Sequence, residues 1–326
     1  MNHVQIIWEL VLAILELSAW ASFFLYLDFL PSGKKENADP YYHRYGFSKE
    51  VVEVPGYWPS NVRVCGFWFL PLEWQFSCDR CGEISSLISS GHLNSNYQMC
   101  PAHAELQSFL ETTSPVFIGL SSAGSMGFLK NPKAFLRVIQ TVVDITSIKF
   151  ILFSADFEPL QTAIQKIAAD ASSGSAQGQI IKDGISLFDG RLFCFFGSIP
   201  YGWLFPKCAA AIHHGGSGST AVALHAGIPQ VICPFMLDQF YWAERMYWLG
   251  VAPEPLKRNH LVPDENDDLS VREAANMLSI AINYALSPKV KARASEIAER
   301  LSLEDGVLEA VKILKEEISS STSTRI

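Results

Sequence analysis

The sequence has few charged residues and no excess of basic ones. Charged side chains make up 18% of the 326 residues, and 25 Lys and Arg stand against 33 Asp and Glu, which gives a net charge of −8. No long basic stripe is present, so the composition argues against nucleic acid as a partner. The length of 326 residues favours about two domains, and the hydrophobic fraction of 49% favours a sizeable core.

The start of the chain lacks the basic stretch and the small-residue cleavage site of a secretory signal. The seven cysteines are an odd number, and most stand singly inside apolar runs: Cys65, Cys194, Cys208 and Cys233. We therefore expect a reducing, cytoplasmic compartment, in which these thiols are small buried hydrophobic groups.

One apolar stretch, residues 10–27, is long enough to suggest a membrane span. Glu16 lies inside it and Glu9 just before it, and an acid near the centre of a span costs about 2.5 kcal/mol or more. Two interpretations stay open, a membrane segment with peripheral membrane contact, or an apolar helix that packs on protein.

From residue 115 onwards, short apolar runs alternate with stretches of helical length. The predicted strands are 115–121, 149–154, 191–197, 209–214 and 230–235; the predicted helices are 132–145, 158–171, 200–207, 219–226, 238–249, 267–286, 289–301 and 305–318. Near-continuous apolar strands alternating with helices predict an α/β fold with a doubly wound, Rossmann-like parallel sheet. We expect residues 172–190 to form a flexible surface loop and residues 75–105 to form a linker or an insertion.

A glycine-rich turn follows the strand predicted at 209–214, in the segment HHGGSGST (213–220). A helix N-terminus presents backbone N–H groups with a positive partial charge, and glycines let the backbone approach an anion closely. His214 and the hydroxyls of Ser219 and Thr220 add donors, so the segment is suited to a diphosphate. The alternative is a plain strand-to-helix turn with a buried histidine. The spacing is neither that of GxGxxG nor that of a P-loop, because no Lys follows.

The next predicted strand ends before Asp238 and Gln239, which open another helix. Ligands of doubly wound sheets bind at the carboxyl ends of the strands. A carboxylate and an amide at this edge suit sugar hydroxyls. Asp238 as a plain N-cap is the alternative, and the two roles are compatible.

The whole segment 213–256 resembles the donor-binding signature of the UDP-glycosyltransferases of the GT-B fold, and it is most similar to the sterol 3-beta-glucosyltransferase branch. Residues 57–70, 115–128 and 198–212 resemble further segments of that branch. The resemblance implies that His214, Gly216 and Gly218 hold a diphosphate, that Asp238 binds sugar hydroxyls, and that residues 196–201 line the base pocket. The residues implied to bind the donor are Ser122, Gly124, Ser125, His214, Gly216, Gly218, Ser219, Thr220, Asp238 and Gln239.

Two aromatic residues near the implied base pocket leave its role open. One departs from the pattern of the sterol glucosyltransferase branch, and the other allows two roles. Tyr201 stands where the branch has His, which puts the recognition of the base in doubt. Trp203 is a candidate platform for uracil, but its place in the motif favours packing.

The resemblance implies a UDP-sugar-dependent enzyme that transfers a hexose, glucose by preference, to a hydroxyl of a sterol or another lipophilic acceptor with inversion. The alternative is a non-catalytic UDP-sugar-binding module, or a truncated isoform without the acceptor domain. The catalytic base is expected in an N-terminal domain that this chain does not contain in full. No cofactor is expected for the chemistry.

The expected organisation has four parts. Residues 1–60 are a remnant of the N-terminal domain with a linker, and residues 61–110 are an interdomain segment with a cysteine-containing insertion. Residues 111–320 form the C-terminal domain that binds the nucleotide sugar, and residues 321–326 are a tail.

A second motif lies in the polar segment before the sheet. Cys78, Cys81, Cys100 and His103 are spaced C-x2-C-x18-C-x2-H, as in structural zinc sites. A zinc ion would stabilise a segment too polar to build its own core. The alternative is a coincidental set of cysteines in a disordered insertion.

Overall fold

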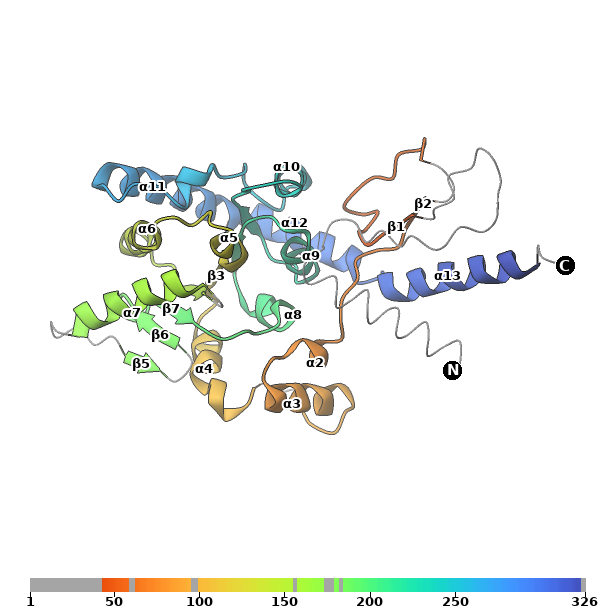
Figure 1. The fold of residues 1–326 in the computed structure, drawn as a ribbon, viewed down its shortest axis with the longest axis horizontal. Helices are drawn as coiled ribbons and strands as arrows, with labels where there is room; N and C mark the ends of the chain where they lie inside the picture. Colours follow the sequence, from red (N-terminus) through yellow and green to blue (C-terminus); the bar gives the residue numbers. More distant parts are fainter. Residues whose placement is uncertain are drawn as a thin grey trace. The chain divides into compact units, whose positions relative to one another are not determined.

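The computed structural model describes residues 43–58, 62–94, 99–154, 157–172, 179–181 and 184–323 (Figure 1). The apolar stretch 10–27 lies outside these residues. The chain divides into two compact units, Met1–Leu70 with Glu299–Ile326, and Pro71–Ala298. Within the described residues, no helix has both the length and the apolar character needed to cross a membrane.

The smaller unit contains two short strands and a long helix. Strands β1 (His43–Tyr45) and β2 (Val62–Val64) pair in parallel, and helix α13 (Gly306–Ser323) extends into the expected tail. Ser48, which is buried, donates its hydroxyl to Glu304 Oε1 at 2.8 Å and so ties the two stretches of this unit together.

The larger unit is built on a sheet in which seven strands are described. Their order is β5 (Gln179–Ile181), β6 (Gly184–Leu187), β7 (Leu192–Phe195), β4 (Phe150–Phe153), β3 (Val116–Gly119), β8 (Ala210–His213) and β9 (Gln230–Ile232). The five strands from β7 to β9 are parallel, and each lies inside one of the five predicted apolar runs. The predicted α/β class is therefore confirmed.

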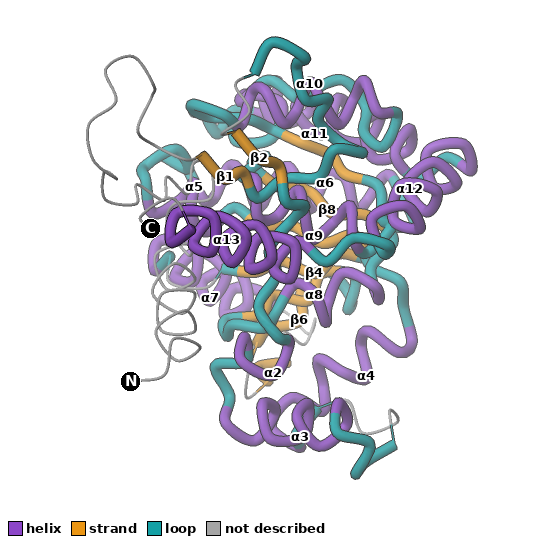
Figure 2. The backbone as a smooth tube through the Cα atoms, turned by 90° about the vertical axis from the view of Figure 1, so that its right-hand side faces the viewer, coloured by secondary structure: helices purple, strands orange, loops and turns teal. Residues whose placement is uncertain are grey.

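Helices surround this sheet (Figure 2). Their bounds are α2 (Leu72–Gln75), α3 (Asp79–Ser89), α4 (Ala104–Thr112), α5 (Ser121–Ser125), α6 (Pro132–Ile145), α7 (Glu158–Ser172), α8 (Tyr201–Leu204), α9 (Ser217–His225), α10 (Gln239–Leu249), α11 (Asp268–Ala285) and α12 (Pro288–Leu301), with the 3-10 turns η1 (Pro101–His103), η2 (Phe205–Lys207) and η3 (Arg258–His260). The helices predicted from residue 132 onwards are confirmed within a few residues, except that the last one extends to Ser323.

The two faces of the sheet bury different cores. Alternate strand residues such as Ile118 and Leu152 pack on one face with residues of α6, α7 and α11. Their neighbours Phe117 and Phe153 pack on the other face with residues of α4, α8 and α9. Because both faces are covered, the strands are apolar at nearly every position, as expected for buried parallel strands.

The expectation of a flexible loop over 172–190 is wrong for residues 179–181 and 184–190, and residues 173–178, 182 and 183 lie outside the described residues. Strands β5 and β6 lie in this segment, and β6 pairs antiparallel with β7, with Leu187 opposite Leu192. The turn between them has left-handed backbone at Asp189 (φ 56°) and Gly190 (φ 75°). Asp-Gly between two apolar runs is a strong hairpin signal, and the polar residues before it obscured this signal.

The segment 75–105 contains more helix than a linker would. Helix α3 occupies Asp79–Ser89, and α4 begins at Ala104. Helix α4 anchors itself on the sheet through Leu106 and Leu110, which are both buried.

Candidate functional site

The predicted donor segments follow three strands that are neighbours in the sheet. The parallel register places Gly119 of β3 opposite His213 of β8, and His213 opposite Ile232 of β9. Helix α5 follows β3, the glycine turn and α9 follow β8, and α10 follows β9 (Figure 1). The three segments therefore meet at one edge of the sheet, where its parallel strands end.

The glycine turn packs directly against the segment that follows β9. Gly215 has a φ of +86°, which residues with a side chain rarely adopt. A Cβ atom at this position would lie 2.8 Å from Ile232 Cγ2 and 3.0 Å from the carbonyl oxygen of Gln239. Only glycine fits both the backbone conformation and the space.

His213 stabilises the glycine turn through hydrogen bonds of both ring nitrogens. It is buried, and its Nδ1 accepts a hydrogen bond from the Gly215 N–H at 3.0 Å, so its Nε2 carries the proton and donates to Gln230 Oε1 at 2.8 Å. Burial lowers the pKa of His213 to about 3, and the nearby His214 acts in the same direction. His213 is thus a neutral, packed residue that holds the turn.

The His214 ring lies against Gly216 of the turn. A Cβ atom at Gly216 would lie 2.6 Å from His214 Nε2, so the imidazole occupies the space above that glycine. Burial lowers the pKa of His214 below its ordinary value. At neutral pH this ring is therefore uncharged, with one N–H donor and one acceptor nitrogen.

Helix α9 begins at Ser217, two residues earlier than predicted. Its N-cap is Gly216, which makes no side-chain capping bond. The first N–H groups of a helix have no partner within the helix, and the dipole makes this end attractive to anions. Ser217 in the first turn is therefore a further candidate for contact with an anion. The predicted helix start at residue 219 missed it, although Gly216 is a common N-cap residue.

The hydroxyls in the first turns of α9 differ in exposure. Gly218 is exposed and Ser219 is half-buried. Thr220 is fully buried, and its hydroxyl has no hydrogen-bond partner among the described residues. A direct contact between Thr220 and a ligand therefore stays a prediction that this burial does not favour.

Gln239 and Asp238 have different surroundings although they are adjacent. Gln239 is buried, and its Oε1 accepts hydrogen bonds from the N–H groups of Phe235 (2.9 Å) and Met236 (3.1 Å). Its amide oxygen is thus committed to the turn before α10. Asp238 is half-buried at the N-cap of α10 without a side-chain capping bond, and burial raises the pKa of its carboxyl group. A side-chain hydrogen bond with Trp242 of the same helix acts in the opposite direction on this pKa. The Asp238 side chain is therefore more exposed than that of Gln239, with Trp242 as a neighbour.

Helix α5 carries the three candidates after β3. Ser122 lies within this helix. Gly124 is buried, and a Cβ atom there would lie 2.8 Å from the ring of Phe157, whereas Ser125 is exposed. The structure thus presents Ser125 to solvent and places Gly124 beneath an aromatic ring.

The implied base pocket is mostly aromatic packing. Tyr201 stacks on Phe205 with ring centroids 4.8 Å apart, and burial raises its pKa to about 12. Trp203 is buried, with Lys207 Nζ 3.9 Å from its ring centroid. The packing role of Trp203 is confirmed.

The four residues of the second motif come together elsewhere in the larger unit. The ligand atoms of Cys78, Cys81, Cys100 and His103 all lie within 4.8 Å of one another. None of the predicted donor residues belongs to this group.

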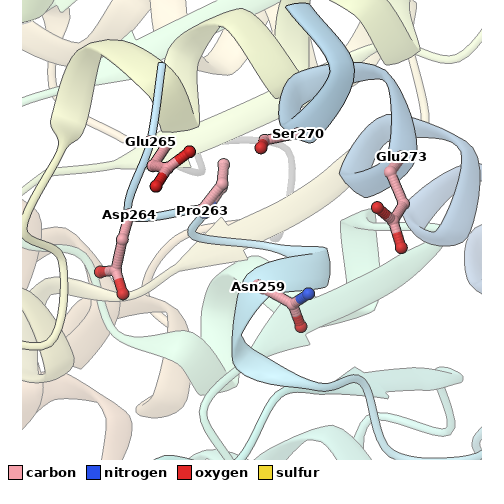
Figure 3. Close-up of a pocket in the computed structure, with 6 residues that line it drawn as sticks. All are labelled: Asn259, Pro263, Asp264, Glu265, Ser270 and Glu273. Atoms are coloured by element: carbon pink, nitrogen blue, oxygen red, sulfur yellow. The ribbon is translucent and has the colours of Figure 1, made fainter. Parts of the chain in front are cut away.

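A cavity of about 210 Å³ opens beside the start of α11 (Figure 3). Asn259, Pro263, Asp264, Glu265, Ser270 and Glu273 line it. Three carboxylates make this cavity unsuited to an anion, and it contains none of the predicted donor residues.

Comparison with known proteins identifies relatives of this chain. Residues 191–299, which run from β7 into α12 and include the glycine turn, match the family described as the erythromycin biosynthesis protein CIII-like C-terminal domain. Two sterol 3-beta-glucosyltransferases of Arabidopsis thaliana are each 30% identical, over 89% and 82% of this chain. The aligned regions make up 36% and 33% of those proteins, so the chain spans about a third of their length.

A third relative and a solved structure extend the comparison. A sterol 3-beta-glucosyltransferase of Debaryomyces hansenii is 40% identical over 39% of this chain and 7% of its own length. The crystal structure of a calicheamicin glycosyltransferase aligns with 85% of this chain and 52% of its own, at 16% identity and a TM-score of 0.49.

Proposed function

We propose that this chain binds a UDP-sugar at the glycine turn and takes part in glycosyl transfer. The proposal starts from two similarities: residues 191–299 match the erythromycin biosynthesis protein CIII-like C-terminal domain, and the chain is similar to sterol 3-beta-glucosyltransferases. Glucose is the proposed sugar, and a sterol or a similar lipophilic alcohol is the proposed acceptor. The transfer proceeds with inversion at the anomeric carbon. The observation that carries the proposal is the turn between β8 and α9.

Three features of this turn support a diphosphate as its ligand. The N-terminus of α9 supplies backbone N–H groups and a positive partial charge. Gly216 leaves the backbone open except where the His214 ring lies over it. The uncharged His214 ring carries an N–H donor, which is suited to a phosphate oxygen.

The same groups act on the leaving group during transfer. Cleavage of the bond between the sugar and the diphosphate places additional negative charge on the terminal phosphate. Donors that are already in place stabilise this charge more in the transition state than in the bound donor. Helix α9 and His214 therefore act where a metal ion acts in other enzymes, and no cofactor is required for this step.

Asp238 is proposed to accept hydrogen bonds from hydroxyls of the sugar. It lies next to the turn because β9 is the neighbour of β8, and its carboxylate bonds Trp242 of the same helix instead of capping the helix. A carboxylate accepts two hydroxyls of one sugar at once. Gln239 is proposed to contribute through its amide N–H groups, since its oxygen holds the preceding turn.

The proposed transfer also needs a base that removes the proton of the acceptor hydroxyl. None of the described histidines of the donor edge suits this task. His213 is paired on both ring nitrogens, and His214 is proposed to face the phosphate. We therefore assign no catalytic base to the described residues. A donor-binding module that does not catalyse transfer remains the second candidate function.

The proposal is tested by titrating UDP-glucose into the purified chain and by assaying glucoside formation with a sterol. His214→Ala is expected to weaken UDP-glucose binding by about tenfold or more, because a hydrogen bond to a charged group contributes about 1.5 to 3 kcal/mol. His225→Ala is the matched control, since His225 is exposed near the other end of the same helix. Binding without product favours the module, and no binding of UDP-glucose refutes the proposal.

A further inference from the structure

The Cys/His cluster, defined as Cys78, Cys81, Cys100 and His103, is assembled from two separate segments. Cys78 is the N-cap of α3, and Cys81 lies in the first turn of that helix. Cys100 directly precedes η1, and His103 ends it. Helices α3 and α4, which flank these two segments, are neighbours in both views (Figure 1, Figure 2). The start of α3 and the segment around η1 thus each contribute two candidate metal ligands to the Cys/His cluster.

Three separations within the cluster fit a tetrahedral ion, and all of its ligand atoms lie within 4.8 Å of one another. Zinc binds sulfur at about 2.3 Å and nitrogen at about 2.0–2.1 Å, so a tetrahedron requires about 3.8 Å between two sulfurs and about 3.6 Å between sulfur and nitrogen. Cys78 Sγ and Cys100 Sγ lie 3.7 Å apart. His103 Nδ1 lies 3.5 Å from Cys81 Sγ and 3.3 Å from Cys100 Sγ. These separations agree with one shared ion to within about 0.3 Å.

The same distances do not fit a disulfide. A disulfide requires about 2.05 Å between the sulfurs, whereas Cys78 and Cys100 are 3.7 Å apart and all three cysteines are free thiols. The N–H of Cys100 points at Cys81 Sγ at 3.4 Å, which is the kind of contact that supports a coordinating thiolate.

Helix α3 has little else to hold it in place. Of its 11 residues only Cys81 and Ser85 are buried, and Ile84, which is half-buried, is the large apolar side chain of this helix that packs against the core. Helix α4 by contrast is anchored by Leu106 and Leu110. An ion shared between Cys78, Cys81 and the segment before α4 would connect a weakly packed helix to a well-packed one.

We propose that the Cys/His cluster binds one zinc ion and that this site is structural. Three thiolates and one imidazole fill all four positions, so no position is open for water or substrate. The ion fixes α3 and η1 against each other, and its binding energy is part of the folding energy of this segment. The proposal is independent of the donor site, which lies at the ends of the strands.

Metal analysis of the purified full chain tests the proposal. One zinc per chain is expected, and Cys81→Ser and His103→Ala are expected to lose it. Cys208→Ser and His92→Ala are the matched controls, because Cys208 is another buried thiol of the larger unit and His92 an exposed histidine that bonds Ser90. Both controls are expected to retain one zinc.

A variant that replaces one metal ligand with another keeps the test decisive, even where the variants that remove a ligand fail to fold. His103→Cys converts the ligand set to four thiolates and is expected to retain one zinc. Cobalt bound in place of zinc gives the strong visible absorption of a tetrahedral thiolate site, and this band is expected to shift between the wild type and His103→Cys. A wild-type chain that is folded without metal, or mass spectrometry showing a disulfide between these cysteines, would overturn the proposal.

Discussion

The glycine turn and the Cys/His cluster hold their functional groups in different ways. In the turn, His213 is paired on both ring nitrogens, and Gly215 fills a space closed by Ile232 and Gln239. In the cluster, the ligand atoms of three cysteines and one histidine lie within 4.8 Å of one another, and Cys81 and Cys100 are buried among apolar side chains. The turn is therefore formed by the protein alone before any ligand binds, whereas the proposed zinc ion would convert the three thiols of the cluster into bound thiolates and hold the two segments together.

Gly215→Ala is expected to have the largest effect on stability. The new Cβ meets Ile232 and the backbone of Gln239, and it does so at a φ of +86°. Overpacking and backbone strain each cost about 1–3 kcal/mol, so the free energy of unfolding should fall by about 3 kcal/mol or more. Urea unfolding measures this. Gly218→Ala, at an exposed position of α9, is the control and should leave stability equal or slightly higher.

The buried His213 is expected to make stability depend on pH. Its pKa is about 3 in the folded chain against 6.5 as the ordinary value. Between these pH values the unfolded chain binds a proton that the folded chain does not. The contribution of His213 to the free energy of unfolding is therefore fully present above pH 6.5. Below this pH it falls by roughly 1.4 kcal/mol per pH unit, which amounts to about 3 kcal/mol by pH 4.

Unfolding of the wild type and of His213→Asn between pH 4 and 7 isolates this effect, since Asn does not titrate. The difference in slope between the two proteins should persist after zinc is removed with a chelator, because His213 has no part in the Cys/His cluster. Equal slopes for the two proteins would show that His213 is accessible to protons in the folded chain.

Thr220→Val is expected to raise the free energy of unfolding by about 1 kcal/mol. The buried hydroxyl has no hydrogen-bond partner among the described residues, so its removal takes away an uncompensated desolvation penalty while keeping the shape. Affinity for UDP-glucose should not change. If Thr220→Val lost affinity for UDP-glucose while Ser219→Ala kept it, α9 would have to expose Thr220 when the donor binds.

The smallest change in stability is expected for Asp238→Ala. Asp238 makes no capping bond, so its removal should alter the free energy of unfolding by less than about 0.5 kcal/mol. Asp267, which caps α11 through bonds to the N–H groups of Leu269 and Ser270, is the control, and Asp267→Ala should lose about 1 kcal/mol. The proposed contact of Asp238 with sugar hydroxyls predicts weaker binding of UDP-glucose and unchanged binding of UDP.

Much of the sheet could be predicted from the sequence because its strands are buried on both faces. The runs around Ile118, Leu152 and Ile212 are apolar without alternation, and this pattern is specific to central parallel strands. Strands β5 and β6 were missed because they are short, lie at the edge and follow a polar stretch. The Asp189-Gly190 turn was the local signal that could have identified them.

At the candidate site, the sequence predicted the neighbourhood but not the exposure of each side chain. The order of strands brings His214 and Asp238 to one edge, as expected of a doubly wound sheet. The burial of Thr220 and the bonds of Gln239 to the preceding turn depend on how α9 and α10 pack on the sheet. Such packing is a tertiary property, and no local pattern of residues encodes it.

The central claim is that the glycine turn holds the diphosphate of a nucleotide sugar through His214. Calorimetric titration of UDP-glucose, UDP and UMP into the wild type and His214→Ala tests it most directly. His214→Ala is expected to weaken the binding of UDP-glucose and UDP by about tenfold or more and to leave the binding of UMP nearly unchanged, because the ring is proposed to face the terminal phosphate. Equal losses for all three ligands, or no loss for any of them, would contradict the account.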